Sequence, residues 1–250
     1  MTKVFVHGNP ECDAVWGPLF AALGERGVDD LVALSPPGFG APVPDGFDAT
    51  PGAYVDWLVA ELEAMDGPID LVGHDWGAGH VMGLLARRPD VVRSWAADCA
   101  ALIHPDYEWH DMAQAWQMPE VGEQVIEAMI GGAIEDRVAT YVDMGLTAEI
   151  ATAMAGATDA AMGECILTLY REAAQPFMVE LGERVVAADR PPGMVVIASE
   201  DHFVPAPLAA EMAERLGAES VVLEGQAHWW MVSAPDAAAD ALADYWAGLG

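Results

Sequence analysis

The sequence predicts an α/β fold, in which a doubly wound, mainly parallel sheet carries an inserted helical lid. Its 250 residues, of which 53% are apolar, are enough for a large core. Short runs rich in β-branched residues alternate with amphipathic helical stretches, which is typical of a parallel sheet covered by helices. One long interval breaks this alternation and contains only helical segments.

Six strands are expected, each a short apolar run bounded by turn residues. They cover residues 3–6, 30–34, 69–72, 92–97, 194–198 and 220–223. The helices expected around them cover residues 16–25, 51–65, 79–88, 207–216 and 236–249. Because strand and helix follow one another in turn, both faces of the sheet should be covered.

The interval that lacks strands covers residues 101–186. Its helical segments contain Met and Trp and are interrupted by Pro119 and by Gly131 and Gly132, which are residues that end helices. The strand pattern resumes afterwards, so we expect a helical cap inserted into one α/β core rather than a separate helical domain. The core would comprise residues 1–100 and 187–250, and the cap residues 101–186.

Charge and cysteine content narrow the expected partners and location. The 40 acidic and 10 basic residues give a formal charge of −30, which repels nucleic acid phosphates and anionic bilayers. Cys12, Cys99 and Cys165 are widely spaced, unlike the closely paired cysteines of thiolate metal sites. The chain shows neither a secretory signal nor an apolar run of membrane-spanning length. We therefore expect a cytoplasmic protein with neither nucleic acid nor membrane partners.

The strongest chemical signal is the segment Gly73-His74-Asp75-Trp76-Gly77, which follows one expected strand and precedes a helix. This is the setting of a nucleophile elbow, where glycines allow a sharp turn that exposes the central side chain. Serine is usual at the centre, whereas a carboxylate is already ionised at neutral pH and can attack without a base. Attack on an sp3 carbon gives an ester that water can cleave. The alternative is a purely structural glycine-rich turn.

A histidine must activate the water that cleaves such an ester, and His228 follows the strand expected at residues 220–223. Asp201 follows the strand expected at residues 194–198 and is the candidate to orient the imidazole. The order nucleophile, acid, histidine is typical of hydrolases with such an elbow. Asp98 is the main rival for the orienting acid, and Glu200 is a weaker one.

Two further residues are candidates for stabilising an anion. The first strand ends at His7-Gly8-Asn9, where the backbone N–H of Asn9 can lie beside that of Trp76 and form an oxyanion hole. The Asn9 amide and the Trp76 indole are also neutral N–H donors. They can converge on a leaving halide. Alternatively, Asn9 is a turn residue and Trp76 a packed core aromatic.

These features resemble the haloalkane dehalogenase and epoxide hydrolase branch of the α/β-hydrolase superfamily. The motifs that carry the resemblance are the elbow, the turn at His7-Gly8-Asn9-Pro10, the turn at Pro36-Pro37-Gly38-Phe39-Gly40, Asp201 and His228. The resemblance implies the α/β-hydrolase fold, an Asp-His-acid triad, an alkyl-enzyme ester and no cofactor. Asn9 and Trp76 match the halide-binding pair of dehalogenases. Epoxide hydrolases share Trp76 but more often have an aromatic residue in place of Asn9.

The sequence departs from these families in two places. The antiparallel strands that usually precede the first parallel strand of dehalogenases are missing. The arginines that follow the nucleophile of fluoroacetate dehalogenases are replaced by Trp76-Gly77-Ala78-Gly79. This second difference favours a neutral, apolar substrate over a carboxylate.

We therefore expect a hydrolase that releases halide from a small neutral haloalkane. Asp75 would be the nucleophile, His228 and Asp201 would activate water, and Asn9 and Trp76 would bind the halide. The alternative enzyme is an epoxide hydrolase in which a lid tyrosine protonates the opening oxygen. Candidates for that proton donor are Tyr107, Tyr141 and Tyr170. A receptor that binds without turnover is the alternative outside enzymes.

Overall fold

The computed structural model describes residues 1–250 and contains one six-stranded sheet in the order β2-β1-β3-β4-β5-β6. All neighbouring strands are parallel. The strands are β1 (Thr2–Val6), β2 (Leu31–Leu34), β3 (Ile69–Gly73), β4 (Ser94–Ala97), β5 (Gly193–Ala198) and β6 (Glu219–Leu223). The predicted doubly wound, mainly parallel sheet is confirmed. The fourth strand begins later than expected, because Pro89–Val91 forms a 3-10 turn before it.

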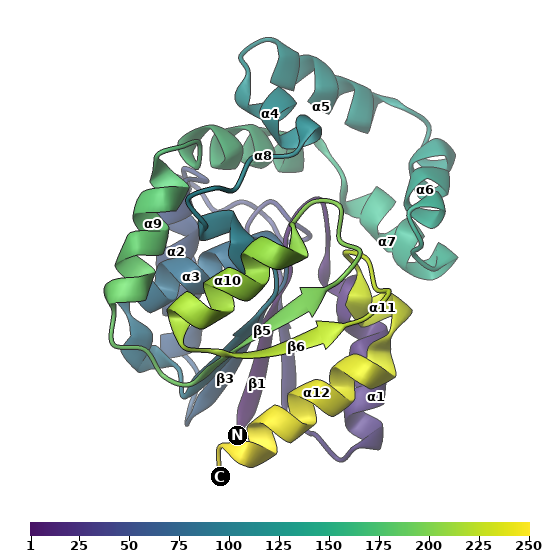
Figure 1. The fold of residues 1–250 in the computed structure, drawn as a ribbon. Helices are drawn as coiled ribbons and strands as arrows, with labels where there is room; N and C mark the ends of the chain where they lie inside the picture. The colour runs from purple at the N-terminus through teal and green to yellow at the C-terminus, as the bar shows by residue number, and fades with distance from the viewer.

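Helices cover both faces of this sheet (Figure 1). On one face lie α1 (Gly17–Glu25), α11 (Trp230–Ser233) and α12 (Pro235–Gly248). On the other lie α2 (Pro51–Glu63), α3 (Trp76–Arg87), α9 (Phe177–Ala187) and α10 (Ala206–Leu216). Side chains alternate between the faces along each strand: Val4 and Val6 belong to one buried cluster, and Phe5 belongs to the other.

Six helices lie between β4 and β5, after a short 3-10 segment at Ala100–Ile103. Besides α9, they are α4 (Asp111–Gln117), α5 (Val121–Gly131), α6 (Ile134–Asp143), α7 (Ala148–Ala157) and α8 (Ala160–Glu172). Two groups form: α4, α5 and α8 pack together, and α6 packs on α7. Figure 1 shows both groups at the end of the sheet where the strands terminate. Helix α9 instead packs against α3.

The sheet order places the candidate residues at one edge. The chain after β1 returns to β2 on one side, and the chain after β3 leads to β4 on the other, so a crevice forms where the strand order reverses. Asn9 follows β1, and Asp75 follows the adjacent β3. Residues 66 positions apart in sequence thereby become neighbours.

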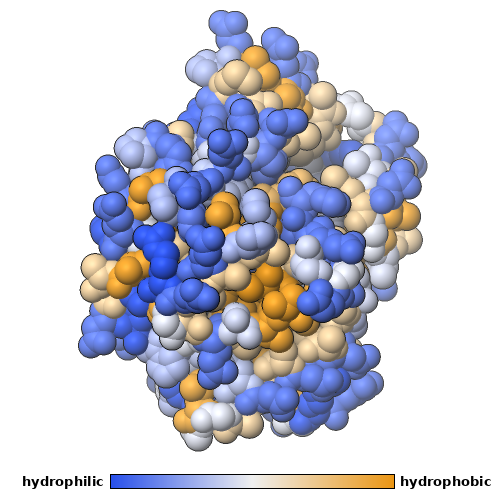
Figure 2. Space-filling model, viewed as in Figure 1, coloured by the Kyte–Doolittle hydropathy of each residue, from blue (hydrophilic) through white to orange (hydrophobic).

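The surface in the view of Figure 2 is mostly hydrophilic, in keeping with the acidic composition. An apolar area lies near the edge strand β6, where Val222 is 47% exposed. No helix of the structure is both long and apolar enough to cross a membrane.

Candidate active site

Asp75 stands at a strained turn between β3 and α3. Its backbone has φ 51° and ψ −122°, a conformation that costs a non-glycine residue of the order of 1–3 kcal/mol and is characteristic of functional sites. The turn depends on close backbone approach, since a Cβ on Gly77 would lie 2.0 Å from the Val6 carbonyl oxygen. A Cβ on Gly8 would lie 2.0 Å from Asp75 Oδ1. Glycine at these positions therefore lets the carboxylate project over the loop after β1.

His228 and Asp201 lie beside this carboxylate, each on the loop after its strand. His228 Nδ1 is 2.8 Å from Asp201 Oδ2, and His228 Nε2 is 3.7 Å from Asp75 Oδ2. The other Asp201 oxygen accepts hydrogen bonds from the backbone N–H of Phe203 at 2.8 Å and of Val204 at 3.3 Å. The structure thus brings Asp75, His228 and Asp201 together in the arrangement that general-base activation of water requires.

The two rival acids lie elsewhere. The Asp98 carboxylate contacts His74, the Trp230 indole and the backbone N–H of Asp75, but not His228. Glu200 is exposed and has no side-chain hydrogen bond to the imidazole. The geometry therefore favours Asp201 as the group that orients His228.

Burial and neighbouring charges shift the pKa values of all three groups. Burial raises the pKa of Asp75 to about 6, although the charge of His228 opposes this shift. Burial acts to lower the pKa of His228, but the hydrogen bond and charge of Asp201, together with the charge of Asp75, outweigh it and raise the pKa. The His228 hydrogen bond similarly overcomes burial and lowers the pKa of Asp201. Shifted pKa values on neighbouring buried groups are characteristic of functional sites.

Asn9 contacts the nucleophile directly, because its backbone N–H donates to Asp75 Oδ1 at 2.9 Å. The side-chain nitrogens Asn9 Nδ2 and Trp76 Nε1 are buried and have no hydrogen-bond partner. The Trp76 indole packs between Trp109, with ring centroids 5.9 Å apart, and Tyr170, at 5.4 Å. Buried donors without partners are rare in folded proteins. Asn9 and Trp76 therefore each keep an unused side-chain N–H donor.

A cavity of about 320 Å³ opens above the nucleophile, between the core and both helix groups. Most of its wall is apolar. From the core it is lined by residues that include Asn9, Asp75 and His228, and from the helices by residues that include Trp116, Met129, Tyr141 and Tyr170. Trp76 does not line this cavity but lies behind Tyr170. A small apolar molecule fits such a space.

The three candidate tyrosines differ in their positions. Tyr170 and Tyr141 line the cavity, and Tyr107 does not. The Tyr170 hydroxyl is 3.5 Å from Asn9 Oδ1. The Tyr141 hydroxyl donates to the carbonyl of Pro10 at 3.3 Å, and that of Tyr107 to the carbonyl of Phe203 at 3.1 Å. Tyr170 is therefore the only one of the three whose phenol contacts a candidate anion-binding residue.

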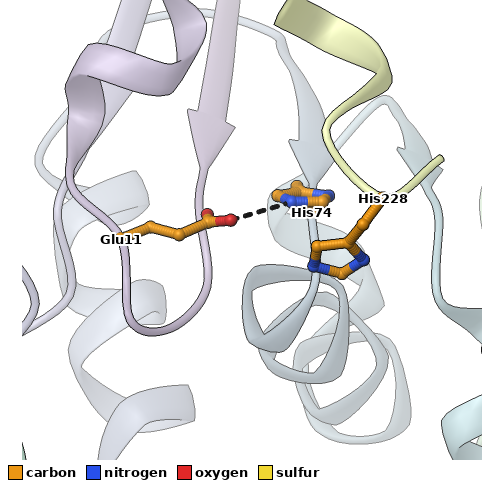
Figure 3. A group of neighbouring side chains, drawn as sticks. All are labelled: Glu11, His74 and His228. Carbon is orange, nitrogen blue, oxygen red and sulfur yellow. Dashed lines mark hydrogen bonds and ion pairs between the residues drawn. The ribbon is translucent and has the colours of Figure 1, made fainter. Parts of the chain in front are cut away.

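A second group of charged residues, which the sequence did not indicate, lies directly beneath the site. His74 Nε2 is 3.0 Å from Glu11 Oε1, and His74 Nδ1 contacts Asp98 Oδ2. Figure 3 shows Glu11 pointing to His74, with the ring of His228 beside it, and the two ring centroids are 4.6 Å apart. Although burial opposes it, the two carboxylates raise the pKa of His74 well above its usual value. His74 is therefore an imidazolium between two carboxylates.

The carboxylates of this group also bind the loops that carry the site. Glu11, whose pKa falls to about 2 because the charge of His74 outweighs burial, accepts hydrogen bonds from the Gly8 backbone N–H at 3.1 Å and from Trp229 Nε1 at 2.5 Å. Asp98 accepts the backbone N–H of Asp75 at 2.9 Å. Of this group, the sequence singled out only Asp98, as a rival for the orienting acid, and it indicated no role for Glu11 or His74.

Two clusters of side chains have the spacing of metal ligands. They are Glu11, His74 and His228, and Cys99, Asp201 and His228. Both ring nitrogens of His74 already face carboxylates, and those of His228 face Asp201 and Asp75. His74 therefore offers no free nitrogen to a metal ion, and His228 Nδ1 is already bound to Asp201.

The sequence matches the alpha/beta hydrolase family model over residues 4–241. The chain belongs to the alpha/beta hydrolase family. No curated protein matches the sequence at a significant level. As this alpha/beta hydrolase has an ordered site facing a cavity, it is a hydrolase enzyme.

Solved structures with the same fold include hydrolases of different kinds. A loop variant of haloalkane dehalogenase DbeA from Bradyrhizobium elkanii has a TM-score of 0.77 and 21% identity, covering 99% of this chain and 89% of that one. N-formylmaleamic acid deformylase from Pseudomonas putida has a TM-score of 0.75 and 16% identity, covering 97% and 91%. E-2-(acetamidomethylene)succinate hydrolase has a TM-score of 0.68 and 19% identity, covering 97% and 90%. At these identities the likeness shows the fold alone.

Proposed function

We propose that this alpha/beta hydrolase is a haloalkane dehalogenase that acts on small neutral haloalkanes. The observation that carries the proposal is that two residues adjoining the carboxylate nucleophile each have a buried side-chain N–H without a partner. They are Asn9, whose backbone binds Asp75, and Trp76, which follows Asp75 in the chain. A carboxylate that attacks a carbonyl would form a high-energy anhydride, whereas attack on an sp3 carbon forms an ordinary ester. A halide leaving from that carbon needs neutral donors, which this pair supplies.

In the first step, an Asp75 oxygen attacks the carbon that bears the halogen. The backbone N–H of Asn9 already donates to Asp75 Oδ1, so Asp75 Oδ2 is the attacking atom. The carbon–halogen bond breaks, and the halide takes its electron pair to the side-chain donors of Asn9 and Trp76. The product is an ester of Asp75.

In the second step, His228 removes a proton from water, and the resulting hydroxide attacks the ester carbonyl. Asp201 holds the imidazole and stabilises its charge. The backbone N–H of Asn9 stabilises the tetrahedral oxyanion at the position where it now binds Oδ1. When the carbon–oxygen bond of the ester breaks, the leaving alkoxide takes the proton held by His228 and departs as the alcohol. Asp75 is left as the carboxylic acid and loses its proton to solvent, which restores the carboxylate.

The helices between β4 and β5 supply the outer wall of the cavity. We propose that residues 101–186 act as the cap that limits substrate size and excludes water, as their sequence predicts. The cavity volume of about 320 Å³ suits a short haloalkane, since pockets for drug-sized ligands range from about 300 to 1,000 Å³. The dehalogenases among the structures with the same fold support this proposal.

The deciding experiment measures bromide release from short bromoalkanes and diol formation from epoxides, with wild type and Asp75→Asn. The proposal predicts bromide release by wild type and its loss in the variant. Ligand binding that raises thermal stability, without turnover of either panel, would instead identify a receptor.

Epoxide hydrolysis is the second candidate, and Tyr170 is the observation that favours it. Its phenol lies in the cavity wall and contacts Asn9, so it can donate a proton to the oxygen of an opening epoxide. Tyr170→Phe should then abolish diol formation but leave bromide release largely unchanged. Tyr107→Phe is the matched control, because Tyr107 does not line the cavity and its phenol donates to the carbonyl of Phe203. Diol formation without bromide release would move the assignment to epoxide hydrolase.

A further inference from the structure

A second cavity of about 250 Å³ lies between α2, α3 and α9, away from the reacting atoms. Most of the surface of its wall is apolar. The apolar residues that line it include Val55 of α2, Trp76 and Ala86 of α3, and Phe177 and Leu181 of α9. Neither the Asp75–His228–Asp201 group nor any other acidic residue lines it. The two cavities share no lining residue, although Trp76, which the proposed function assigns to the halide, lies in the wall of this one.

His80 provides a polar atom on the wall of this cavity. Its side chain is 1% exposed and stacks on Tyr54, with ring centroids 4.7 Å apart. His80 Nε2 is buried and has no hydrogen-bond partner. Burial lowers the pKa of His80 to about 3, so the ring is neutral and offers one donor and one acceptor. A buried polar atom without a partner is costly, and His80 is one of the residues that line this cavity.

The exposed lining residues of the cavity carry positive charge. They include Arg87 and Arg184, although the chain has only 10 basic residues against 40 acidic ones. Arg87 pairs with Asp56. Arg184 makes no ion pair, and its guanidinium lies 5.9 Å from the Phe177 ring. In a strongly acidic protein, such a mouth is a local site of attraction for an anion.

We propose that this cavity binds a small hydroxylated carboxylate with an apolar body. The carboxylate pairs with Arg184 and Arg87 at the mouth, where guanidinium groups bind carboxylates well. The body packs against Val55 and Phe177, and the hydroxyl bonds to His80 Nε2. The volume of about 250 Å³ corresponds to roughly eight water molecules at about 30 Å³ each. The ligand is therefore smaller than a typical drug-sized molecule.

Calorimetric titration of the intact protein with three matched probes tests this proposal. The first probe, 4-hydroxybenzoate, carries a carboxylate and a hydroxyl. Benzoate carries only the carboxylate, and phenol carries only the hydroxyl. We expect 4-hydroxybenzoate to bind about fivefold or more tightly than either of the others, because each lacks one polar contact. Equal affinity for all three, or no binding of any, would overturn the proposal and leave the cavity to water.

Two variants locate the binding site. Arg184→Gln should weaken 4-hydroxybenzoate binding by about three- to tenfold, the loss expected for one charge-assisted contact, and leave phenol binding unchanged. Arg215→Gln, which removes an exposed arginine of α10 outside this cavity, should have no effect. His80→Leu should lower the affinity for 4-hydroxybenzoate to that for benzoate. If this buried variant does not fold, the surface variant Arg184→Gln still decides the question.

Asp75→Asn separates this proposal from the proposed function. The variant should bind 4-hydroxybenzoate as tightly as wild type, because Asp75 does not line the second cavity. Loss of binding in Asp75→Asn would place the probe in the catalytic cavity and contradict the proposal. Retained binding would support it whether or not the enzyme releases halide.

Discussion

The structure places two histidines between carboxylates at the same edge of the sheet, and the two arrangements differ in one respect. His74 has both ring nitrogens in contact with carboxylates and is fully buried. His228 has one nitrogen bound to Asp201, while the other is 3.7 Å from Asp75 beside the cavity. His74 is thus held by a carboxylate at each nitrogen, whereas His228 has one nitrogen that can exchange a proton. Access to one free nitrogen distinguishes the reactive group from the structural one.

The buried group nevertheless supports the reactive one. Glu11 binds the Gly8 amide and Trp229, and Asp98 binds the Asp75 amide. These contacts join the loops after β1, β3 and β6 through one imidazolium. Because charges without partners are costly inside a protein, each member depends on the others. We infer that this group fixes the distance between nucleophile and base.

The largest expected effect comes from removing the reactive nitrogen. In His228→Gln, turnover should fall by about 10⁴-fold or more, as in other enzymes that lose their catalytic histidine. Asp75 can still attack, so the ester should accumulate. Mass spectrometry after incubation with a bromoalkane should show a protein heavier by one alkyl group. Normal turnover, or an unmodified mass after a stoichiometric burst of bromide, would contradict the proposed role of His228.

The next prediction compares substitutions of Asp201 and Asp98. Asp201→Asn should lower turnover by about 10⁴-fold, because the imidazole loses its orienting acceptor, and should affect stability little. Asp98→Asn should chiefly destabilise the fold, since it leaves His74 with one carboxylate. Steady-state kinetics and urea unfolding on the same preparations measure both effects. If Asp98→Asn instead stopped ester hydrolysis at unchanged stability, Asp98 would be the orienting acid.

A smaller effect on turnover, but a large one on stability, is expected for Glu11→Gln. Breaking one partner of a buried ion pair costs about 3–5 kcal/mol of unfolding free energy. Glu123→Gln is the matched control, because its ion pair with Arg171 is on the surface, with Glu123 52% exposed. That pair should contribute about 1 kcal/mol or less. Similar urea midpoints for both variants would show that the buried group does not stabilise the protein.

The strands and the reactive residues are predictable from sequence because their signals are local. Each strand is a short apolar run, and all six are found within one or two residues of the expected positions. Helix α3 is an exception at its start, since it begins at Trp76 although Gly77 and Gly79 suggested a later start. Glycine disfavours helix in isolation, but here the tight approach to the loop after β1 requires it.

The buried group could not be predicted, because its contacts join distant parts of the chain. Glu11 and His74 are 63 residues apart, and Glu11 and Trp229 are 218 apart. Local sequence does not indicate that Glu11 turns inward, since most glutamates are exposed. Asp98 was correctly expected at the edge of the sheet, but its choice of His74 over His228 depends on the side-chain geometry.

The smallest effect concerns pH and follows from the burial of Asp75. Its pKa is raised from 3.8 to about 6 in the folded protein. Burial therefore favours the protonated carboxyl, and the associated stability is lost as pH rises through about 6. Asp75→Asn, which stays neutral, should exceed wild type in unfolding free energy by on the order of 2 kcal/mol at about pH 8.

Thermal unfolding across a pH series measures this difference. Asp75→Asn should melt about 4–8 °C above wild type at the alkaline end, and the two should converge below the ordinary aspartate pKa of 3.8. Activity should show the opposite trend in wild type, because attack needs the ionised carboxylate: kcat/KM should fall about tenfold for each pH unit below about 6. A constant difference in melting temperature across the series would mean that the gain comes from packing, not from removing a buried charge. In that case the loss of stability at high pH and the reactivity of the enzyme would not both come from the desolvated carboxylate of Asp75.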